Sequence, residues 1–345
     1  MGRISYVKKF SLACAIFAIP FTTSTVLVLL GNQQQIDVLT DKYLVIEKLK
    51  KIHTINHAFI HIRNLYGQNV NSPDVTKSSV IRELSALGVI LDLPSTSPTY
   101  RALVKLQASA EVGFEGIVNE GSTLYSRLND IDQMLIRVNQ LEELYISDNH
   151  IFNDDDIYSL NLISMITYFF NSPISVMEKS KIIGASILNQ GYIDSQGVNS
   201  LQHLSEALKS DSSRLLLRIE NTFNSNDITS QQFTSYRQQL NGIKIINRIM
   251  EDSITFDPSL ATKPSLFINN CDHEISKLRK LQSTFVKALL ARYQQRITDL
   301  KNQQISNLVL ILCVFLIALY LFMGIFTSIN HSFKALVSVS TPHLT

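Results

Sequence analysis

Three histidines of one predicted helix are the most regular set of potential metal ligands in the sequence. His53, His57 and His61 are each separated by four residues, which stacks them on one face of a helix. Imidazoles arranged in this way can form one edge of a zinc site. No carboxylate lies on the same face nearby, because Asp41 and Glu47 are too far back along the chain. We therefore interpret the histidines as the polar flank of an apolar stripe, and a metal edge is the alternative.

Residues 153–156, Asn-Asp-Asp-Asp, have a composition that calcium-binding loops also use. An EF-hand loop needs a glutamate at position 12, and counting from Asn153 that position is Ser164. Carboxylates directly before a helix also stabilise its N-terminus, where the backbone dipole is positive. We therefore predict that this run caps a helix beginning at Ile157, with a ligand role as the alternative.

Arg63 ends the apolar stripe of the helix that carries the histidines, beside Asn64 and Tyr66. A guanidinium group can bind an anion through two parallel hydrogen bonds. It can equally form an ion pair with an acidic neighbour in the folded protein. The local sequence leaves both interpretations open.

Common catalytic motifs do not occur in this sequence. The nearest approach to a glycine-rich phosphate loop, Gly113 and Gly116, lies inside a helical pattern. There is no Gly-x-Ser-x-Gly, His-Glu-x-x-His or Cys-x-x-Cys motif. Cys271 is the only cysteine outside the two apolar runs described below, so a zinc site built on cysteine is excluded. We therefore predict no enzymatic activity, no cofactor and no metal.

Two uncharged apolar runs account for the unusual composition. The 345-residue chain is 45% hydrophobic but only 17% charged, and the excess lies at residues 10–30 and 308–329. Each run is long enough to cross a hydrocarbon core of about 30 Å at a rise of about 1.5 Å per residue. The first run is longer than a signal-peptide core and lacks a cleavage site of small residues. Both runs are therefore predicted to be transmembrane helices.

The charges beside the first run set the predicted topology. Three basic residues precede it: Arg3, Lys8 and Lys9. The first acidic residue is Asp37, and the positive-inside rule then keeps residues 1–9 in the cytoplasm. The second span returns residues 330–345 to the cytoplasm. Residues 31–307 are thus predicted to lie in a periplasm, and the chain is predicted to be a two-span protein of a bacterial inner membrane.

The segment between the runs predicts an all-α domain. From residue 36 to residue 65 the apolar residues recur at steps of three or four, which indicates one long amphipathic helix. The same pattern runs from residue 265 straight into the second apolar run. Strand-like alternation is absent from the sequence. Further helices are predicted over residues 74–91, 98–117, 124–145, 157–170, 173–188, 198–223 and 230–255.

The architecture is predicted from the two ends of this segment. Its first and last helices continue into the membrane helices, so they must stand side by side and antiparallel at the membrane surface. Short connections favour up-and-down packing of helices. We predict two stacked four-helix layers, with the long first and last helices running through both.

Five segments occur in an order that points to a class of protein. They are an anchor with an inner proline at residues 9–30, IDVLTDKY at 36–43 leading to Arg63, NHIFNDDDIYSL at 149–160, ARYQQRI at 291–297, and LYLFMG at 319–324. Together they resemble the input half of bacterial transmembrane receptors. The resemblance is greatest to methyl-accepting chemotaxis proteins with a large helical periplasmic sensor. Similar input halves occur on histidine kinases and diguanylate cyclases.

The resemblance implies a homodimer, a site for an unidentified small periplasmic ligand within the helical bundle, and a HAMP linker after the second span. The chain also resembles nitrate-sensing helical domains, in which Arg63 falls at a basic position. A second basic position falls near Lys179 and Lys181. On this basis the candidate ligand-binding residues are Arg63, Tyr66, Lys179 and Lys181.

Residues 330–345 resemble the first HAMP helix and the start of its connector. A HAMP linker needs a second helix, which the sequence does not contain, and no kinase, cyclase or signalling coiled-coil segment follows. The expectation is a sensor and transmembrane module without an output domain, able to form mixed dimers with full-length receptors. Nucleic acid is not an expected partner. A scaffolding inner-membrane protein with a helical periplasmic rod is the competing interpretation, and the sensor half of a kinase or cyclase is another.

Overall fold

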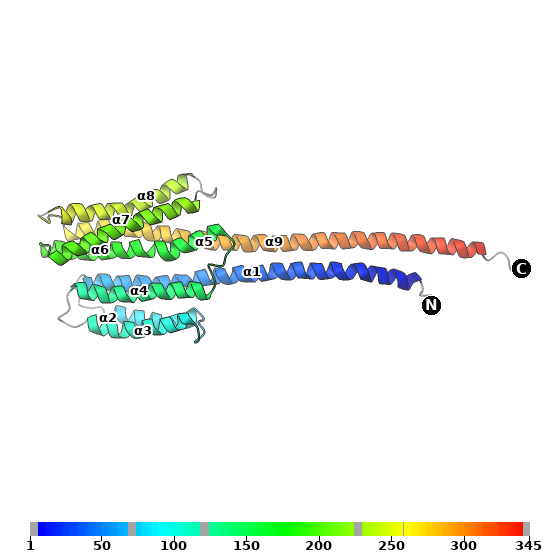
Figure 1. Ribbon diagram of the computed structural model, residues 1–345, viewed down its shortest axis with the longest axis horizontal. Coiled ribbons are helices and arrows are strands. Elements are labelled where there is room, and N and C mark those ends of the chain that lie inside the picture. Colours follow the sequence, from blue (N-terminus) through cyan, green and yellow to red (C-terminus); the bar gives the residue numbers. More distant parts are fainter. Residues whose placement is uncertain (1–5, 68–73, 118–123, 224–229, 258, 341–345) are drawn as a thin grey trace. The chain divides into compact units, whose positions relative to one another are not determined.

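The computed structural model describes residues 6–67, 74–117, 124–223, 230–257 and 259–340, with side chains at 19–65, 78–112, 124–223, 233–257, 259–328 and 331–332. The described residues form helices and turns and contain no strand, which confirms the all-α prediction. The helices are α1 (Tyr6–Gly67), α2 (Asp74–Ile90), α3 (Pro98–Ile117), α4 (Leu124–Asp148), α5 (Ile157–Ser164), α6 (Asn171–Gln190), α7 (Ser195–Phe223), α8 (Ser230–Met250) and α9 (Pro264–Ser340), shown in Figure 1.

The chain divides into two compact units. Unit 2 contains Lys42–Arg292, and unit 1 contains the residues before and after it. The long helices α1 and α9 each have residues in both units, and neither helix is interrupted at the boundary. The prediction that the first and last amphipathic stripes run on into the apolar runs without a break is therefore confirmed.

Unit 2 is a helical bundle with a continuous apolar interior. In it α3 packs against α2 and α4, and α7 packs against α6 and α8. The Phe285 ring of α9 is surrounded by aromatic rings from the neighbouring helices. Its centroid lies 5.4 Å from those of Phe170 and Phe223 and 5.1 Å from that of Tyr236. The α9 helix is thus anchored by large side chains directly before α6 and on α7 and α8.

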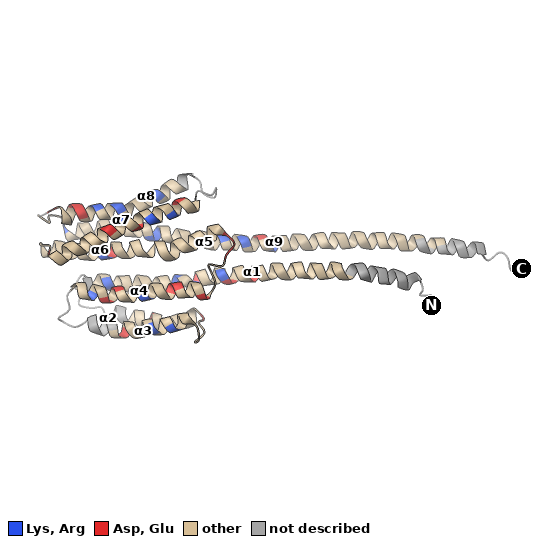
Figure 2. Ribbon diagram, viewed as in Figure 1, with Lys and Arg blue, Asp and Glu red and all other residues tan. Residues whose placement is uncertain are grey.

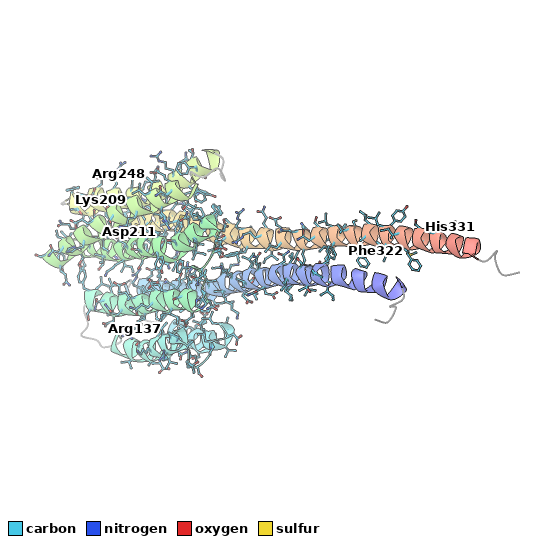
Figure 3. All side chains as sticks on the ribbon, turned by 45° about the vertical axis from the view of Figure 1, so that its right-hand side comes forward. Arg137, Lys209, Asp211, Arg248, Phe322 and His331 are labelled. Carbon is cyan, nitrogen blue, oxygen red and sulfur yellow. The ribbon has the colours of Figure 1, made fainter. Side chains whose placement is uncertain are left out.

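Charged side chains occupy the outer faces of the same helices. Arg137 of α4, Lys209 of α7 and Arg248 of α8 are exposed and project from the bundle, as Figure 3 shows. This division of polar and apolar faces is what the spacing of three and four residues predicts for amphipathic helices.

A serine caps the start of α3. Ser97 precedes the helix, and its Oγ accepts a hydrogen bond from the backbone N–H of Tyr100 at 3.0 Å. Pro98 is the first helical residue, where its missing N–H costs no helical hydrogen bond. The helix predicted over residues 98–117 is therefore confirmed at both ends.

The predicted break between residues 170 and 173 is wrong. A π-helical turn, Met165–Phe169, joins α5 to α6, and the Phe170 N–H donates to the Met165 carbonyl at 3.2 Å. Pro173 lies in the first turn of α6, where proline is tolerated. The wider turn accommodates one additional residue while Phe170 stays fully buried in the aromatic cluster. Another π-helical turn, Glu251–Thr255, ends α8.

In unit 1 the apolar runs of α1 and α9 have many exposed side chains. On α9 the exposed fraction is 65% for Leu310 and 77% for Tyr320, and on α1 it is 64% for Ile19 and Leu27. Figure 2 shows no charged residue along these stretches of the two helices. Large uncovered apolar surfaces usually mark contact with a protein or a membrane.

Two segments of the described chain are long and apolar enough to cross a membrane: Pro264–Ser328 and Ile157–Gln190. None of the most apolar window of the first is buried, whereas half of that of the second is buried inside the bundle. By its burial, Ile157–Gln190 is a core segment of unit 2. In the predicted first span, residues 10–30, the side chains of residues 10–18 lie outside the described residues, and the span stays a prediction.

Gly184 of α6 is required by the packing of α9 and of the π-helical turn after α8. A Cβ atom at this position would lie 2.5 Å from Phe267 Cζ and 2.8 Å from Ile254 Cδ1, and both neighbours are buried. We expect Gly184→Ala to lower the free energy of unfolding by about 1–3 kcal/mol because the core is overpacked. Urea denaturation of the full chain in detergent measures the change. Gly88→Ala, whose Cβ would meet only an ordinary contact at 3.4 Å, should be neutral or stabilising, and an equal loss in both variants would contradict the steric explanation.

Candidate functional site

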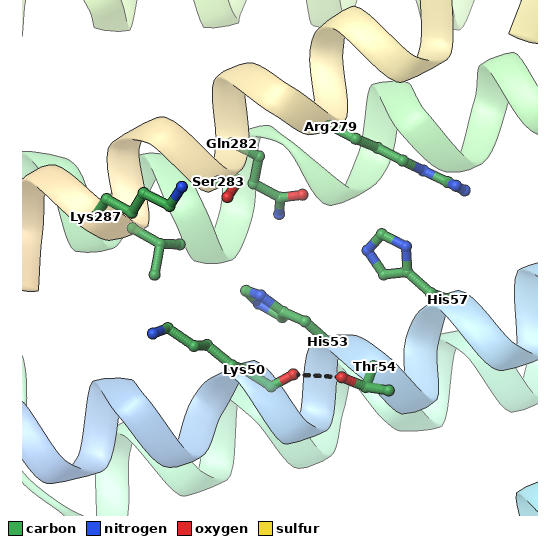
Figure 4. Close-up of a pocket in the computed structure, with 9 residues that line it drawn as sticks. Lys50, His53, Thr54, His57, Arg279, Gln282, Ser283 and Lys287 are labelled. Carbon is green, nitrogen blue, oxygen red and sulfur yellow. Dashed lines mark hydrogen bonds between the residues drawn. The ribbon is translucent and has the colours of Figure 1, made fainter.

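A groove with a volume of about 550 Å³ lies between α1 and α9 within unit 2 (Figure 4). The α1 wall is formed by Lys50, His53, Thr54 and His57. The α9 wall is formed by Arg279, Gln282, Ser283, Val286 and Lys287. This volume lies within the range of about 300–1,000 Å³ that is typical of small-molecule sites.

Helical periodicity brings the groove residues of α1 together. Lys50, His53 and His57 are separated by three and four residues, so they share one face of the helix. The neighbouring face carries Leu49 and Ile52, which are 2% and 0% exposed. Burial of this apolar stripe in the bundle fixes the rotation of α1 and turns the polar face toward the groove.

A chain of hydrogen bonds behind the groove connects α1 to α9 through α4 and α6. The Nε2 atom of His53 lies 3.0 Å from Glu142 Oε1, and Glu142 Oε2 accepts from Asn171 Nδ2 at 3.1 Å. The Oδ1 atom of Asn171 accepts from Gln282 Nε2 at 3.0 Å. Both oxygens of the buried Glu142 carboxylate are thereby satisfied, which avoids the cost of an unpaired buried charge.

A second polar cluster lies around Glu178 of α6. Its Oε1 accepts from Arg279 Nη2 at 2.8 Å, and its Oε2 accepts from Asn64 Nδ2 at 3.1 Å and lies 2.7 Å from Lys181 Nζ. Burial alone would raise the pKa of Glu178, but Lys181, Arg279 and Asn64 outweigh burial and lower it. The carboxylate is therefore ionised at neutral pH and holds Arg279 at the edge of the groove.

The two groove histidines have opposite pKa shifts. Burial lowers the pKa of His53, but the charge and hydrogen bond of the Glu142 carboxylate outweigh burial and raise it above its ordinary value. Burial, followed by the charges of Arg279 and His53, lowers the pKa of His57 to about 4 against a smaller opposing effect of Glu178. His57 is therefore neutral at pH 7 and lies in a positive local potential.

The groove has an excess of basic groups. None of its nine lining residues is acidic. Among the described residues, neither Lys50 nor Lys287 has a carboxylate partner, whereas Glu142 and Glu178 behind the groove are already matched by donors from the bundle. The groove can therefore attract and hold negative charge.

Two of the predicted ligand residues, Arg63 and Lys179, both donate hydrogen bonds to the carboxylate of Asp132. Arg63 is fully buried, and its Nη1 donates to Asp132 Oδ1 at 2.6 Å. Its Nη2 donates to the Ser175 carbonyl at 2.8 Å. Lys179 Nζ donates to the other oxygen of Asp132 at 2.5 Å. Arg63 and Lys179 therefore converge as the prediction supposed, but Asp132 of α4 occupies the point where they meet.

The other predicted ligand residues lie apart from that pair. Lys181 Nζ lies 2.7 Å from Glu178 Oε2 and donates to Asp272 Oδ1 at 2.6 Å, so it belongs to the Glu178 cluster. The side chain of Tyr66 lies outside the described residues. Since Arg63, Lys179 and Lys181 do not line the groove, a role in ligand binding stays a prediction for these residues.

The three histidines of α1 have three different environments. His53 pairs with Glu142, His57 lines the groove and His61 is exposed. Within the described part of the chain, no group of three or more His, Cys, Asp or Glu side chains could hold a metal ion. The expectation that the histidines have no carboxylate nearby holds within their own helix, but Glu142 reaches His53 from α4.

The acidic run at residues 153–156 lies directly before a helix that begins at Ile157, as predicted, but it makes further contacts that were not predicted. Asp156 occupies the cap position of α5, but its carboxylate makes no hydrogen bond to the helix backbone. Instead, Asp156 Oδ2 accepts from Arg292 Nε of α9 at 3.0 Å. Asp154 Oδ2 accepts from Lys42 Nζ of α1 at 3.2 Å. The run therefore ties the loop before α5 to both long helices, which a local capping rule could not indicate.

Sequence reasoning missed the α9 side of the groove. Arg279, Gln282 and Lys287 lie on the polar side of α9, whereas the prediction of this helix used only its apolar residues. Their spacing of three and five residues keeps them on a shared side of α9. This spacing could have predicted a basic side of the helix. What the sequence could not indicate is that this side faces Lys50 and the histidines of α1.

Comparison with protein-family models, curated proteins and solved structures gave no match to this chain. Function is therefore inferred from the residues and the geometry described above.

Proposed function

We propose that this chain is a receptor-like membrane protein whose helical bundle binds a small ligand outside the cytoplasm. In this proposal the apolar runs of α1 and α9 lie in the bilayer, and the bundle is a periplasmic sensor arranged as two stacked four-helix layers. The chain acts as a homodimer and has no catalytic activity of its own. This is the arrangement that the resemblance to chemotaxis receptors implies.

One observation carries the proposal: the walls of the groove are the same two helices that carry the exposed apolar runs. The α1 helix is continuous over Tyr6–Gly67 and α9 over Pro264–Ser340. A ligand that contacts both walls therefore acts directly on the two helices that would enter the membrane. A ligand can shift the relative position of two helices only by the difference in its affinity for the two arrangements.

The groove is suited to this role because its walls are connected by polar bonds rather than by apolar packing alone. His53 and Gln282 are joined through Glu142 and Asn171. A bound ligand that hydrogen-bonds to His53 or Gln282 competes with this network and changes the energy of the α1–α9 arrangement. In a scaffolding protein, by contrast, an open polar groove between the two long helices has no evident purpose.

Reporter fusions test the topology on which the proposal depends. We expect a fusion after Gly197, at the start of α7, to give a periplasmic signal with alkaline phosphatase. A fusion after Ser340, at the end of α9, should give a cytoplasmic signal, because the basic residues before the first run keep the N-terminus inside. A periplasmic signal at Ser340, or a cytoplasmic one at Gly197, would rule out a two-span receptor.

A further inference from the structure

We propose that the α1–α9 groove binds a small organic or inorganic anion that carries at least two acidic groups. The proposal deepens the function proposed above, since it assigns the chemical class of the ligand of that groove. The shared chemistry is an array of carboxylate or phosphate oxygens. Of the residues that the sequence analysis singled out, only His53 and His57 line this groove, and the residues predicted from the resemblance do not.

The first step of the argument is the unmatched charge of the groove. Lys50 and Lys287 come from opposite walls, and among the described side chains neither forms an ion pair. Like charges brought to one site repel each other, and the repulsion is relieved when an anion binds between them. Lysine ammonium groups act as strong point charges toward phosphate and carboxylate oxygens.

The second step is the arrangement of donors along the groove. Figure 4 shows Lys50 and Lys287 toward one end, and His57 below Arg279 toward the other. Seven residues separate Lys50 from His57, which corresponds to about 10 Å along the helix axis. A single carboxylate cannot contact both ends at once. An anion with two separated acidic groups can engage the lysine end and the Arg279 end together.

The third step concerns the donors that remain available. Arg279 uses Nη2 to bind Glu178, while its buried Nε has no hydrogen-bond partner. The Ser283 hydroxyl lines the same wall and is exposed. Burial and, after it, the charge of Arg279 lower the pKa of His57, which is consistent with a positive potential at this end. An anion here would satisfy the arginine and offset that potential.

Calorimetric titration of the full chain in a neutral detergent, at constant ionic strength, tests the proposal. Citrate and pyrophosphate serve as multivalent probes, one for each chemistry, and acetate serves as the monovalent probe. We expect at least one multivalent probe to bind at least tenfold more tightly than acetate. Binding of citrate alone identifies a carboxylate ligand, and binding of pyrophosphate alone identifies a phosphate ligand.

Paired variants separate the groove from general surface charge. The double variant Lys50→Gln/Lys287→Gln should weaken binding at least tenfold, because both unpaired ammonium groups are removed. The control Lys51→Gln/Lys280→Gln removes the same net charge from exposed positions on the same helices outside the groove, and should change the affinity less than twofold. Equal weakening in both double variants, or no binding of any probe to the folded wild-type chain, would overturn the proposal.

A failure of the anion proposal can be distinguished from a failure of the receptor proposal. If no probe binds but the reporter fusions give the expected topology, the receptor proposal stands and the anion assignment is wrong. If the probes bind and depend on Lys50 and Lys287 but the topology is different, the anion site stands without the receptor.

Discussion

Replacing Asp132 with alanine is expected to lower the free energy of unfolding by about 3–5 kcal/mol, the typical cost of removing one partner of a buried ion pair. Arg63 has no exposed surface, and Asp132 is its charged partner at 2.6 Å. The two bonds to Ser175 are to neutral atoms and do not compensate the charge. Without Asp132, the bundle would hold an uncompensated guanidinium in its interior.

Urea denaturation of the full chain in detergent, followed by circular dichroism, measures this loss. Asp130→Ala is the matched control, because Asp130 is exposed on the same helix and its replacement should change stability by no more than about 0.5 kcal/mol. The double variant Asp132→Leu/Arg63→Met removes both charges and should recover much of the loss. If Asp132→Ala instead left stability unchanged, the contact would not be an essential buried pair, and Arg63 would be free to bind a ligand.

The all-α fold was predictable because its signals are local. The apolar spacing that marks α1 and α9 depends only on residues three and four positions apart, and the Ser97-Pro98 cap lies within one turn. Even the wrong break near Pro173 has a local origin, since proline usually ends or starts a helix. The π-helical turn that removed the break keeps Phe170 against Phe285, a contact between distant segments that a local rule does not detect.

The candidate site was less predictable because its pairs are remote in sequence. His53 and Glu142 are 89 residues apart, and Arg63 and Asp132 are 69 residues apart. Which carboxylate meets which base depends on the register between α1 and α4. The sequence of a single helix does not determine its rotation about its axis or its position along that axis within the bundle. The sequence therefore identified Arg63 and the histidines as unusual but could not supply their partners.

The pH dependence of stability is expected to differ sharply between the wild type and His57→Gln below pH 6.5. The folded-state pKa of His57, about 4, is below its ordinary value of 6.5, so between these values the unfolded state binds more protons. Stability therefore falls as the pH falls through this window. From pH 7.5 to pH 5 the loss attributable to His57 is about 2 kcal/mol, on the basis of about 1.4 kcal/mol per pKa unit.

The contribution of His53 to stability depends on pH in the opposite direction and changes over a different pH range. Its pKa is raised by Glu142, so its stabilising contribution is complete below pH 6.5 and is lost as the pH rises through the folded-state pKa. Arg279 of α9 and Glu178 of α6 also face His57, and the lowered pKa of Glu178 keeps its carboxylate ionised between pH 5 and pH 6.5. The difference between the wild type and His57→Gln in this range therefore reports the titration of His57, including its repulsion by His53.

Urea midpoints of the full chain, measured from pH 5 to pH 7.5, provide the comparison. We expect the stability of His57→Gln to fall less steeply than that of the wild type, because glutamine does not titrate and the buried site no longer opposes a proton. His61→Gln removes an exposed histidine from the same helix one turn further on, and its profile should follow the wild type. Parallel profiles for the wild type and His57→Gln would mean that His57 is not held neutral by burial and by Arg279. The groove would then lack the positive potential attributed to its Arg279 end.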